Sequence, residues 1–165
     1  MKEIKEQEAV QALMKQIQEG VFLVVKAGDR TNLMTIGWAL SGYVWRRSTI
    51  MVAVRNSRFT YGLIEKADSF TINVPSRNME KSLQICGSKS GRDTNKFQEC
   101  RLATQPAKKV TTPILQIPGY HIECRIICKV PMDPKNMLPE LETLYPARDY
   151  HTLYFGEILA CSFID

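Results

Sequence analysis

Long apolar runs and histidines are scarce in this sequence. No run approaches the roughly 20 apolar residues that a transmembrane helix needs. Met1–Val10 is charged where a signal peptide would be apolar. These absences argue against a membrane association and favour a cytoplasmic location. The only histidines are His121 and His151, so no metal site is expected.

Cysteine occurs in an odd number, five, without a secretion signal, which argues against a disulfide framework. Cys124 and Cys128 lie in one expected strand, where a rise of about 3.3 Å per residue separates them by roughly 13 Å. That distance is too long for a disulfide or a shared metal ion. We expect free thiols, buried or half-buried.

Clustered basic residues are also missing, although the net charge is +5. The only adjacent basic pairs are Arg46-Arg47 and Lys108-Lys109, whereas nucleic-acid-binding proteins usually carry basic stripes. Nucleic acid is therefore not an expected partner. A mild positive charge suits a phosphorylated small molecule equally well.

What is present is ordinary globular composition, 44% hydrophobic and 24% charged over 165 residues. A helix is predicted where apolar residues repeat at i, i+3, i+4 and i+7 and a glycine follows, at Val10, Leu13, Met14, Ile17 and Gly20. Six strands are predicted, over residues 21–25, 32–40, 49–54, 69–74, 120–130 and 152–163. Shorter helices are expected over 57–66 and 78–86. Irregular stretches are expected over 87–95, 101–119 and 131–150, and the second of them should hold one short strand.

Few helices and many short connections between strands predict a mainly β fold, an antiparallel barrel with a few short helices. No repeat or boundary divides the chain, so a single domain over residues 1–165 is expected. In the strand over 120–130, alternation turns Ile122 and Cys124 inward and Glu123 outward.

The strand over 32–40 alternates between bulky and small side chains. Met34, Ile36, Trp38 and Leu40 share one face, and the other carries Thr35, Gly37 and Ala39. A face of small residues leaves room for a flat ligand, or for close packing of another strand or helix.

Arg55-Asn56-Ser57-Arg58-Phe59-Thr60 joins a buried strand to an expected helix start. Free backbone N–H groups and two guanidinium groups there favour an anion such as phosphate. The alternative is that Ser57 only caps the helix and that the arginines lie on the surface.

Cys86–Phe97 contains two glycines with Ser90, Arg92 and Lys96 as hydrogen-bond donors. It lacks the spacing of a Walker A loop and could equally be an exposed loop. His151 opens the last strand, and no Ser-His-Asp or Cys-His arrangement can be assigned to it.

Taken in order, several segments resemble the flavin reductase-like family of FMN-binding split barrels, which includes the flavoredoxins. They span residues 32–157 and read NLMTIGW from Asn32, VRNSRFT from Val54, FTINVP from Phe70, CG at Cys86, SGRDTNKF from Ser90 and HTLYFGE from His151.

This resemblance implies a homodimeric split antiparallel β-barrel with FMN near the subunit interface. It implies that Met34–Trp38 lines the isoalloxazine ring and that His151 lies near the nicotinamide as the catalytic residue. The implied cofactor-binding residues are Asn32, Met34, Thr35, Ile36, Trp38, Val54, Arg55, Ser57, Arg58, Thr60, Ser90, Gly91 and Lys96.

The implied function is an NAD(P)H-dependent flavin reductase, with NADH or NADPH as electron donor. The first alternative is a flavoredoxin-like electron-transfer protein that holds FMN tightly and takes electrons from a redox protein partner. A flavin-binding module without turnover and an oxidase of the pyridoxamine phosphate type are further alternatives. Many reductases of this family have Gly-Asp-His where this chain has Asp149-Tyr150-His151.

Overall fold

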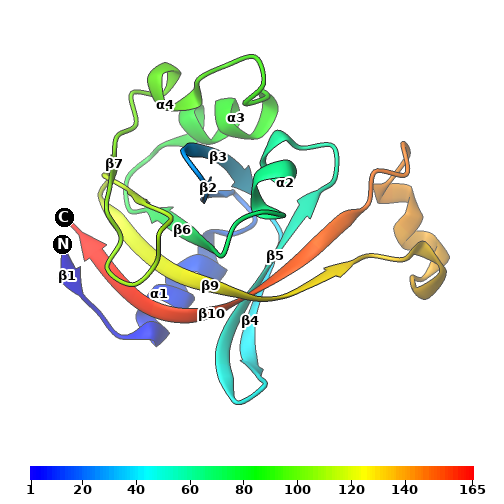
Figure 1. Ribbon diagram of the computed structural model, residues 1–165, viewed down its shortest axis with the longest axis horizontal. Coiled ribbons are helices and arrows are strands. Elements are labelled where there is room, and N and C mark those ends of the chain that lie inside the picture. The colour runs from blue at the N-terminus through cyan, green and yellow to red at the C-terminus, as the bar shows by residue number, and fades with distance from the viewer.

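The computed structural model describes residues 1–165 and is built around one antiparallel sheet that curls on itself (Figure 1). The hydrogen-bonded order of its strands is β3-β2-β6-β9-β10-β5-β4, and β1 pairs with β10. The strand bounds are β1 Lys2–Glu3, β2 Val21–Ala27, β3 Arg30–Ile36, β4 Ala39–Val44, β5 Arg47–Arg55, β6 Ser69–Pro75, β9 Gly119–Pro131 and β10 His151–Ile164. The expected mainly β fold with a few short helices is confirmed.

The two ends of this strand order meet at Gly37-Trp38, the short link between β3 and β4. There the Ala53 N–H of β5 donates to the Trp38 carbonyl oxygen at 3.3 Å. The long strands β9 and β10 bend at register shifts in β10, one of them at Gly156. A Cβ at Gly156 would lie 2.5 Å from Phe70 Cζ, so the bend needs glycine there.

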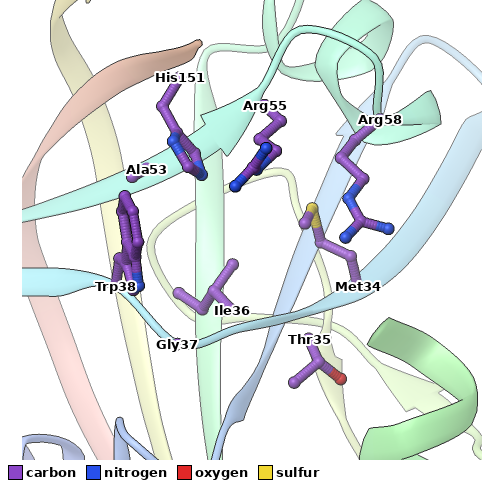
Figure 2. A pocket seen from close by; sticks show the side chains of 9 residues that line it. All are labelled: Met34, Thr35, Ile36, Gly37, Trp38, Ala53, Arg55, Arg58 and His151. Atoms are coloured by element: carbon purple, nitrogen blue, oxygen red, sulfur yellow. The ribbon is translucent and has the colours of Figure 1, made fainter. Parts of the chain in front are cut away.

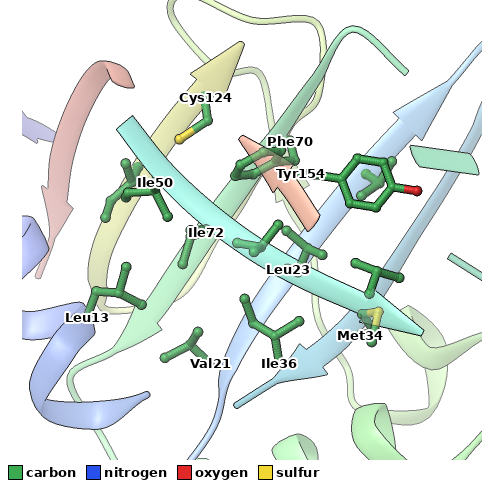
Figure 3. Close-up of a cluster of buried hydrophobic side chains, with 14 of the residues drawn as sticks. Leu13, Val21, Leu23, Met34, Ile36, Ile50, Phe70, Ile72, Cys124 and Tyr154 are labelled. Atoms are coloured by element: carbon green, nitrogen blue, oxygen red, sulfur yellow. The ribbon is translucent and has the colours of Figure 1, made fainter. Parts of the chain in front are cut away.

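Apolar side chains from every long strand fill the interior of the curled sheet (Figure 3). Helix α1, Glu6–Gln16, covers one end of it with Ala9 and Leu13, both fully buried. The helix and the role of Leu13 agree with the sequence pattern, but Met14 is 41% exposed. The buried stripe of α1 is therefore narrower than the spacing suggested.

A second apolar cluster lies on the other face of β2 and β3, under α3 (Glu80–Ser88) and α4 (Lys96–Glu99). It includes Phe22, Val24 and Leu33, all fully buried. Because β2 is covered on both faces, its sequence is continuously apolar rather than alternating.

The strand expected over residues 32–40 is wrong in extent, because the chain changes direction at Gly37-Trp38 and forms two strands. β4 leaves the barrel in a hairpin with β5. Trp38 and Leu40 are therefore 42% and 63% exposed instead of continuing the buried face of Met34 and Ile36.

The helix after β5 also differs from its prediction. Helix α2 runs only over Phe59–Ile64, and its N-cap is Arg58. Ser57 does not cap it, since the Ser57 N–H and hydroxyl both donate to the Asp149 carboxylate. With six residues, α2 is too short to add much of a helix dipole to an anion site.

Glu123 was expected to face solvent but is buried on β9. Its carboxylate accepts hydrogen bonds from the backbone N–H groups of Lys108 and Lys109, at 2.9 and 2.6 Å. The stretch around these lysines was expected to hold one strand and holds two, β7 (Thr104–Gln105) and β8 (Ile114–Leu115), paired with each other. The loop that carries Lys108 and Lys109 thereby covers Glu123, which the alternation of the strand had placed on the outer face.

The remaining excursion, residues 131–150, is irregular as predicted and contains two 3₁₀ helices, η1 (Pro134–Asn136) and η2 (Pro139–Leu144). All five cysteines are free thiols, in agreement with the expectation. No helix of the structure combines the length and the apolar character that spanning a membrane requires.

Candidate functional site

A cavity of about 200 Å³ opens where the end of β3, the end of β5 and the start of β10 meet (Figure 2). Antiparallel pairing sets His151 of β10 directly opposite Arg55 of β5, so both side chains reach the cavity. Its lining consists of Met34, Thr35, Ile36, Gly37, Trp38, Ala53, Arg55, Arg58 and His151.

The floor of the cavity is the segment Met34–Trp38. Met34 and Ile36 are buried and belong to the barrel core, which fixes the backbone. The Thr35 hydroxyl donates to the Leu83 carbonyl oxygen of α3 at 2.6 Å, and Gly37 presents no side chain. A Cβ at Gly37 would meet only the Ile17 carbonyl oxygen, at 3.6 Å. Packing would therefore allow a small side chain at this position of the floor.

Two guanidinium groups reach the cavity wall, and neither has a carboxylate partner. Arg55 Nη2 donates to the Leu144 carbonyl oxygen at 3.0 Å, and Arg58 Nη1 donates to the Gly87 carbonyl oxygen at 2.9 Å. Carbonyl oxygens hold these groups in place without cancelling their charge. The wall is therefore positively charged.

Arg92 is a third guanidinium without a carboxylate partner, on the loop next to Arg58. Its Nη1 is 3.4 Å from the Ser57 carbonyl oxygen, and its guanidinium lies over the Phe59 ring at 5.9 Å. Arg58 and Arg92 line one surface depression adjoining the cavity, so the positive charge extends beyond it.

Aromatic rings surround His151 on the opposite wall. The Trp38 ring packs on the imidazole with 4.6 Å between centroids. The Tyr145 hydroxyl lies 2.8 Å from His151 Nδ1, and the Arg55 guanidinium lies over the Tyr145 ring at 5.1 Å. His151 Nε2 has no hydrogen-bond partner in the protein and is left to the cavity.

Burial is the main cause that lowers the pKa of His151 to about 4, and the positive charge of Arg55 contributes in the same direction. The imidazole is therefore neutral at physiological pH. A neutral imidazole can donate or accept a hydrogen bond at the cavity, but it adds no charge to the two arginines.

Five predicted site residues lie beside the cavity rather than in it: Asn32, Thr60, Ser90, Gly91 and Lys96. Asn32, on β3, donates from Nδ2 to the Thr60 hydroxyl at 2.8 Å, and both side chains are buried. Lys96 Nζ donates to the Leu33 and Cys86 carbonyl oxygens, at 3.1 and 2.8 Å. Asn32, Lys96 and Gly91 line another depression, which shares Arg92 with the one that Arg58 and Arg92 line.

Lys96 is buried, and burial lowers its pKa. Its ammonium serves two backbone carbonyls and fastens α4 to β3. Gly91 packs just as closely, since a Cβ there would lie 2.5 Å from Asn32 Oδ1. The Ser90 hydroxyl accepts from the Arg92 N–H at 3.1 Å and shapes the same loop.

The structure does not bring two of the predicted residues to the cavity by their side chains. Val54 is fully buried in the core, because alternation along β5 turns Ala53 and Arg55 toward the cavity and Val54 away. The Ser57 N–H and hydroxyl are engaged by Asp149, as described above.

Tyr145 is the residue that sequence reasoning missed. It is 3% exposed, and it is the only buried residue of the excursion 131–150. The available signal was weak, a lone tyrosine in a stretch rich in proline and charge. The six-residue spacing between Tyr145 and His151 does not predict a contact between them. The contact arises because the excursion folds back to the start of β10.

Solved structures share the fold of this chain. Flavoredoxin of Desulfovibrio vulgaris (Miyazaki F) superposes with a TM-score of 0.70 at 24% identity, over 88% of this chain and 69% of that one. An FMN-binding domain of a flavin reductases-like enzyme from Shewanella baltica superposes with a TM-score of 0.71 at 18% identity, over 96% and 74% of the two chains. The curled sheet is thus the split barrel of flavin reductase-like proteins.

The sequence comparison identifies the family of the chain, whereas the structural similarity shows only its fold. Residues 14–165 match the model of the flavin reductase like domain, and the chain belongs to that family. An uncharacterized protein of Archaeoglobus fulgidus is 29% identical over 138 residues, which cover 84% of this chain and 68% of that protein.

Proposed function

We propose that this chain binds FMN at the cavity and acts as an NAD(P)H-dependent flavin reductase. The observation that carries this proposal is that Arg55 and Arg58 have no carboxylate partner and lie beside the part of the cavity floor where Gly37 has no side chain. A flat ring with an attached phosphate dianion matches that combination, because guanidinium groups bind phosphate oxygens with charge-assisted hydrogen bonds.

The residues present fit this cofactor. Met34–Trp38 would lie along the isoalloxazine ring, and backbone groups of this edge would meet its polar rim. Arg55 and Arg58 would take the ribityl phosphate. The Shewanella baltica domain, which is named as FMN-binding, shares the fold, and this supports the assignment.

FMN, when bound, supplies the hydride and electron chemistry, so no protein nucleophile is required. The chain contributes binding, orientation and charge. The charge at the cavity comes from Arg55 and Arg58, which would pair with the phosphate, whereas the Lys96 ammonium is already bound by two backbone carbonyl oxygens. His151 offers a neutral Nε2 to a ligand in the cavity.

One observation favours the second candidate, a flavoredoxin-like protein that holds FMN and exchanges electrons with a protein partner. Trp38 covers one face of the His151 ring. A nicotinamide cannot stack on that face, which disfavours direct use of NAD(P)H. The similarity to a flavoredoxin supports the same alternative.

Anaerobic titration of the purified chain separates these functions. A yellow protein whose flavin bleaches with NADH or NADPH supports the reductase. Bound flavin that bleaches only with a chemical reductant contradicts the reductase and leaves electron transfer. A chain that neither contains nor takes up FMN contradicts both.

We also propose that the chain is a homodimer, as the family resemblance implies. The β4–β5 hairpin exposes Leu40, Tyr43 and Trp45 at 63%, 74% and 55%, a large apolar surface for a monomer. Light scattering that returns the mass of two chains supports this; a monomer mass at micromolar concentration contradicts it.

A further inference from the structure

Tyr145 contacts His151 in a way that neither its sequence position nor the flavin assignment explains. The excursion 131–150 is exposed or half-exposed throughout except at Tyr145. Its backbone returns to the barrel at this point, where the Asn56 N–H donates to the Tyr150 carbonyl oxygen at 3.2 Å. The excursion thus places one buried phenol against His151, whose own side chain lines the cavity.

Three groups fix the His151 ring. The Tyr145 hydroxyl lies 2.8 Å from Nδ1, the Trp38 ring packs on one face at 4.6 Å, and the Tyr145 ring meets the imidazole edge-on at 5.5 Å. Arg55, the nearest cation, is turned to the Leu144 carbonyl oxygen and makes no hydrogen bond to the imidazole. Only Nε2 remains open to the cavity (Figure 2).

The Tyr145 hydroxyl has one proton and two acceptors within reach. His151 Nδ1 is at 2.8 Å, and Met132 Sδ is at 3.6 Å. A thioether is a weak acceptor, whereas a neutral imidazole nitrogen is a strong one. The proton therefore goes to Nδ1, and the ring proton of His151 must then sit on Nε2.

We infer that Tyr145 is a positioning residue that holds His151 as the Nε2–H tautomer, so that the cavity receives a neutral hydrogen-bond donor aimed at a carbonyl oxygen of its ligand. This rests on the proposed function for the identity of the ligand. A ligand carbonyl could be one of the flavin ring or the carboxamide of a nicotinamide. The tautomer itself depends on neither.

The tautomer can be measured on the ligand-free protein by ¹⁵N NMR of the histidine rings. Only two histidines occur, and His121 serves as an internal reference because it is fully buried and does not line the cavity. In the wild type, we expect protonated Nε2 and unprotonated Nδ1 at His151. In Tyr145→Phe, which keeps the ring and removes the hydroxyl, we expect the two tautomers to mix.

Tyr150→Phe is the matched control. Its ring lies 4.9 Å from Tyr145 and next to His151 in sequence, but its hydroxyl makes no hydrogen bond. It should leave the His151 tautomer unchanged. A wild-type His151 protonated at Nδ1, or a Tyr145→Phe spectrum identical to that of the wild type, would overturn the inference. Should Tyr145→Phe fail to fold, coupling between the Tyr145 hydroxyl proton and Nδ1 in the wild type decides instead.

Ligand measurements then identify the acceptor. Loss of an oriented donor should weaken its ligand by about three- to tenfold. A raised KM for the nicotinamide nucleotide at unchanged FMN affinity assigns the carboxamide, and weakened FMN binding assigns the flavin carbonyl. No change in either, with the tautomer altered, refutes a contact between His151 and a ligand carbonyl. A wild type that binds no FMN refutes the proposed function and leaves the tautomer result standing.

Discussion

The two ends of the β5–β10 ladder carry arginines in opposite circumstances. At the end where Thr49 pairs with Glu157, Arg47 and Arg125 both bind the Glu157 carboxylate. At the end where Arg55 pairs with His151, the guanidinium groups of Arg55 and Arg58 donate hydrogen bonds only to backbone carbonyl oxygens. One end of this ladder thus lies beside a neutralised cluster and the other beside a cluster that keeps its charge.

The difference shows where the protein needs a partner from outside. A nearby carboxylate does exist at the cavity end, on Asp149, but it is engaged by the Ser57 N–H and hydroxyl. Two cations held in place and not neutralised prepare a site for an anion, because the ligand does not have to displace a protein carboxylate. The Glu157 end offers no such opening.

The largest effect that we expect at the cavity end is a pH-dependent change in the free energy of unfolding, caused by His151. Below pH 6.5 the unfolded chain protonates its histidines, whereas His151 in the folded chain stays neutral down to about pH 4. Stability is therefore fully present above pH 6.5 and is lost as the pH falls toward 4. Between pH 7 and 5, the share of His151 is about 2 kcal/mol.

His151→Gln should remove that share. Urea unfolding of both proteins at pH 7 and pH 5 measures it, and the drop in unfolding free energy should be smaller in the variant. His121, whose pKa burial also lowers to about 4, contributes the same drop to both proteins. An equal drop in the two proteins would mean that His151 protonates freely, and that the cavity end is not a desolvated, positively charged region.

The next effect is on flavin binding. Arg58→Ala should weaken FMN about tenfold or more, since a charge-assisted hydrogen bond contributes about 1.5–3 kcal/mol. Arg47→Ala is the control from the other end of the ladder and should leave FMN affinity unchanged. Fluorescence titration with FMN measures both. Equal affinities for the two variants would break the comparison.

The sequence predicted the fold well where packing follows periodicity. Strands and helices with a buried face, such as β2 and α1, appear close to their expected positions. The predictions of burial fail where a segment distant in sequence covers the residue. Glu123 is buried because the loop with Lys108 and Lys109 crosses it, and no period in the strand could show that loop.

The site was predictable to the extent that it lies on regular strands. Arg55 and His151 reach the cavity because register and alternation place them there, and the motif order pointed to both. Tyr145 and Asp149 were not predictable, because an irregular excursion carries them. Ser57 was misassigned as a cap, since its partner is Asp149, 92 residues away.

The smallest effect belongs to the neutralised end. Glu157→Gln removes the shared partner of Arg47 and Arg125, and both guanidiniums are about half exposed, so we expect a loss below about 1 kcal/mol at pH 7. The two arginines lower the pKa of Glu157, so its contribution is present above its ordinary value of 4.5 and is lost as the pH falls below it. Urea unfolding of the wild type and the variant should therefore differ at pH 7 and converge toward pH 3, with FMN affinity unchanged. A large loss of stability, or weakened FMN binding, would mean that the two ends of the ladder are coupled rather than separate.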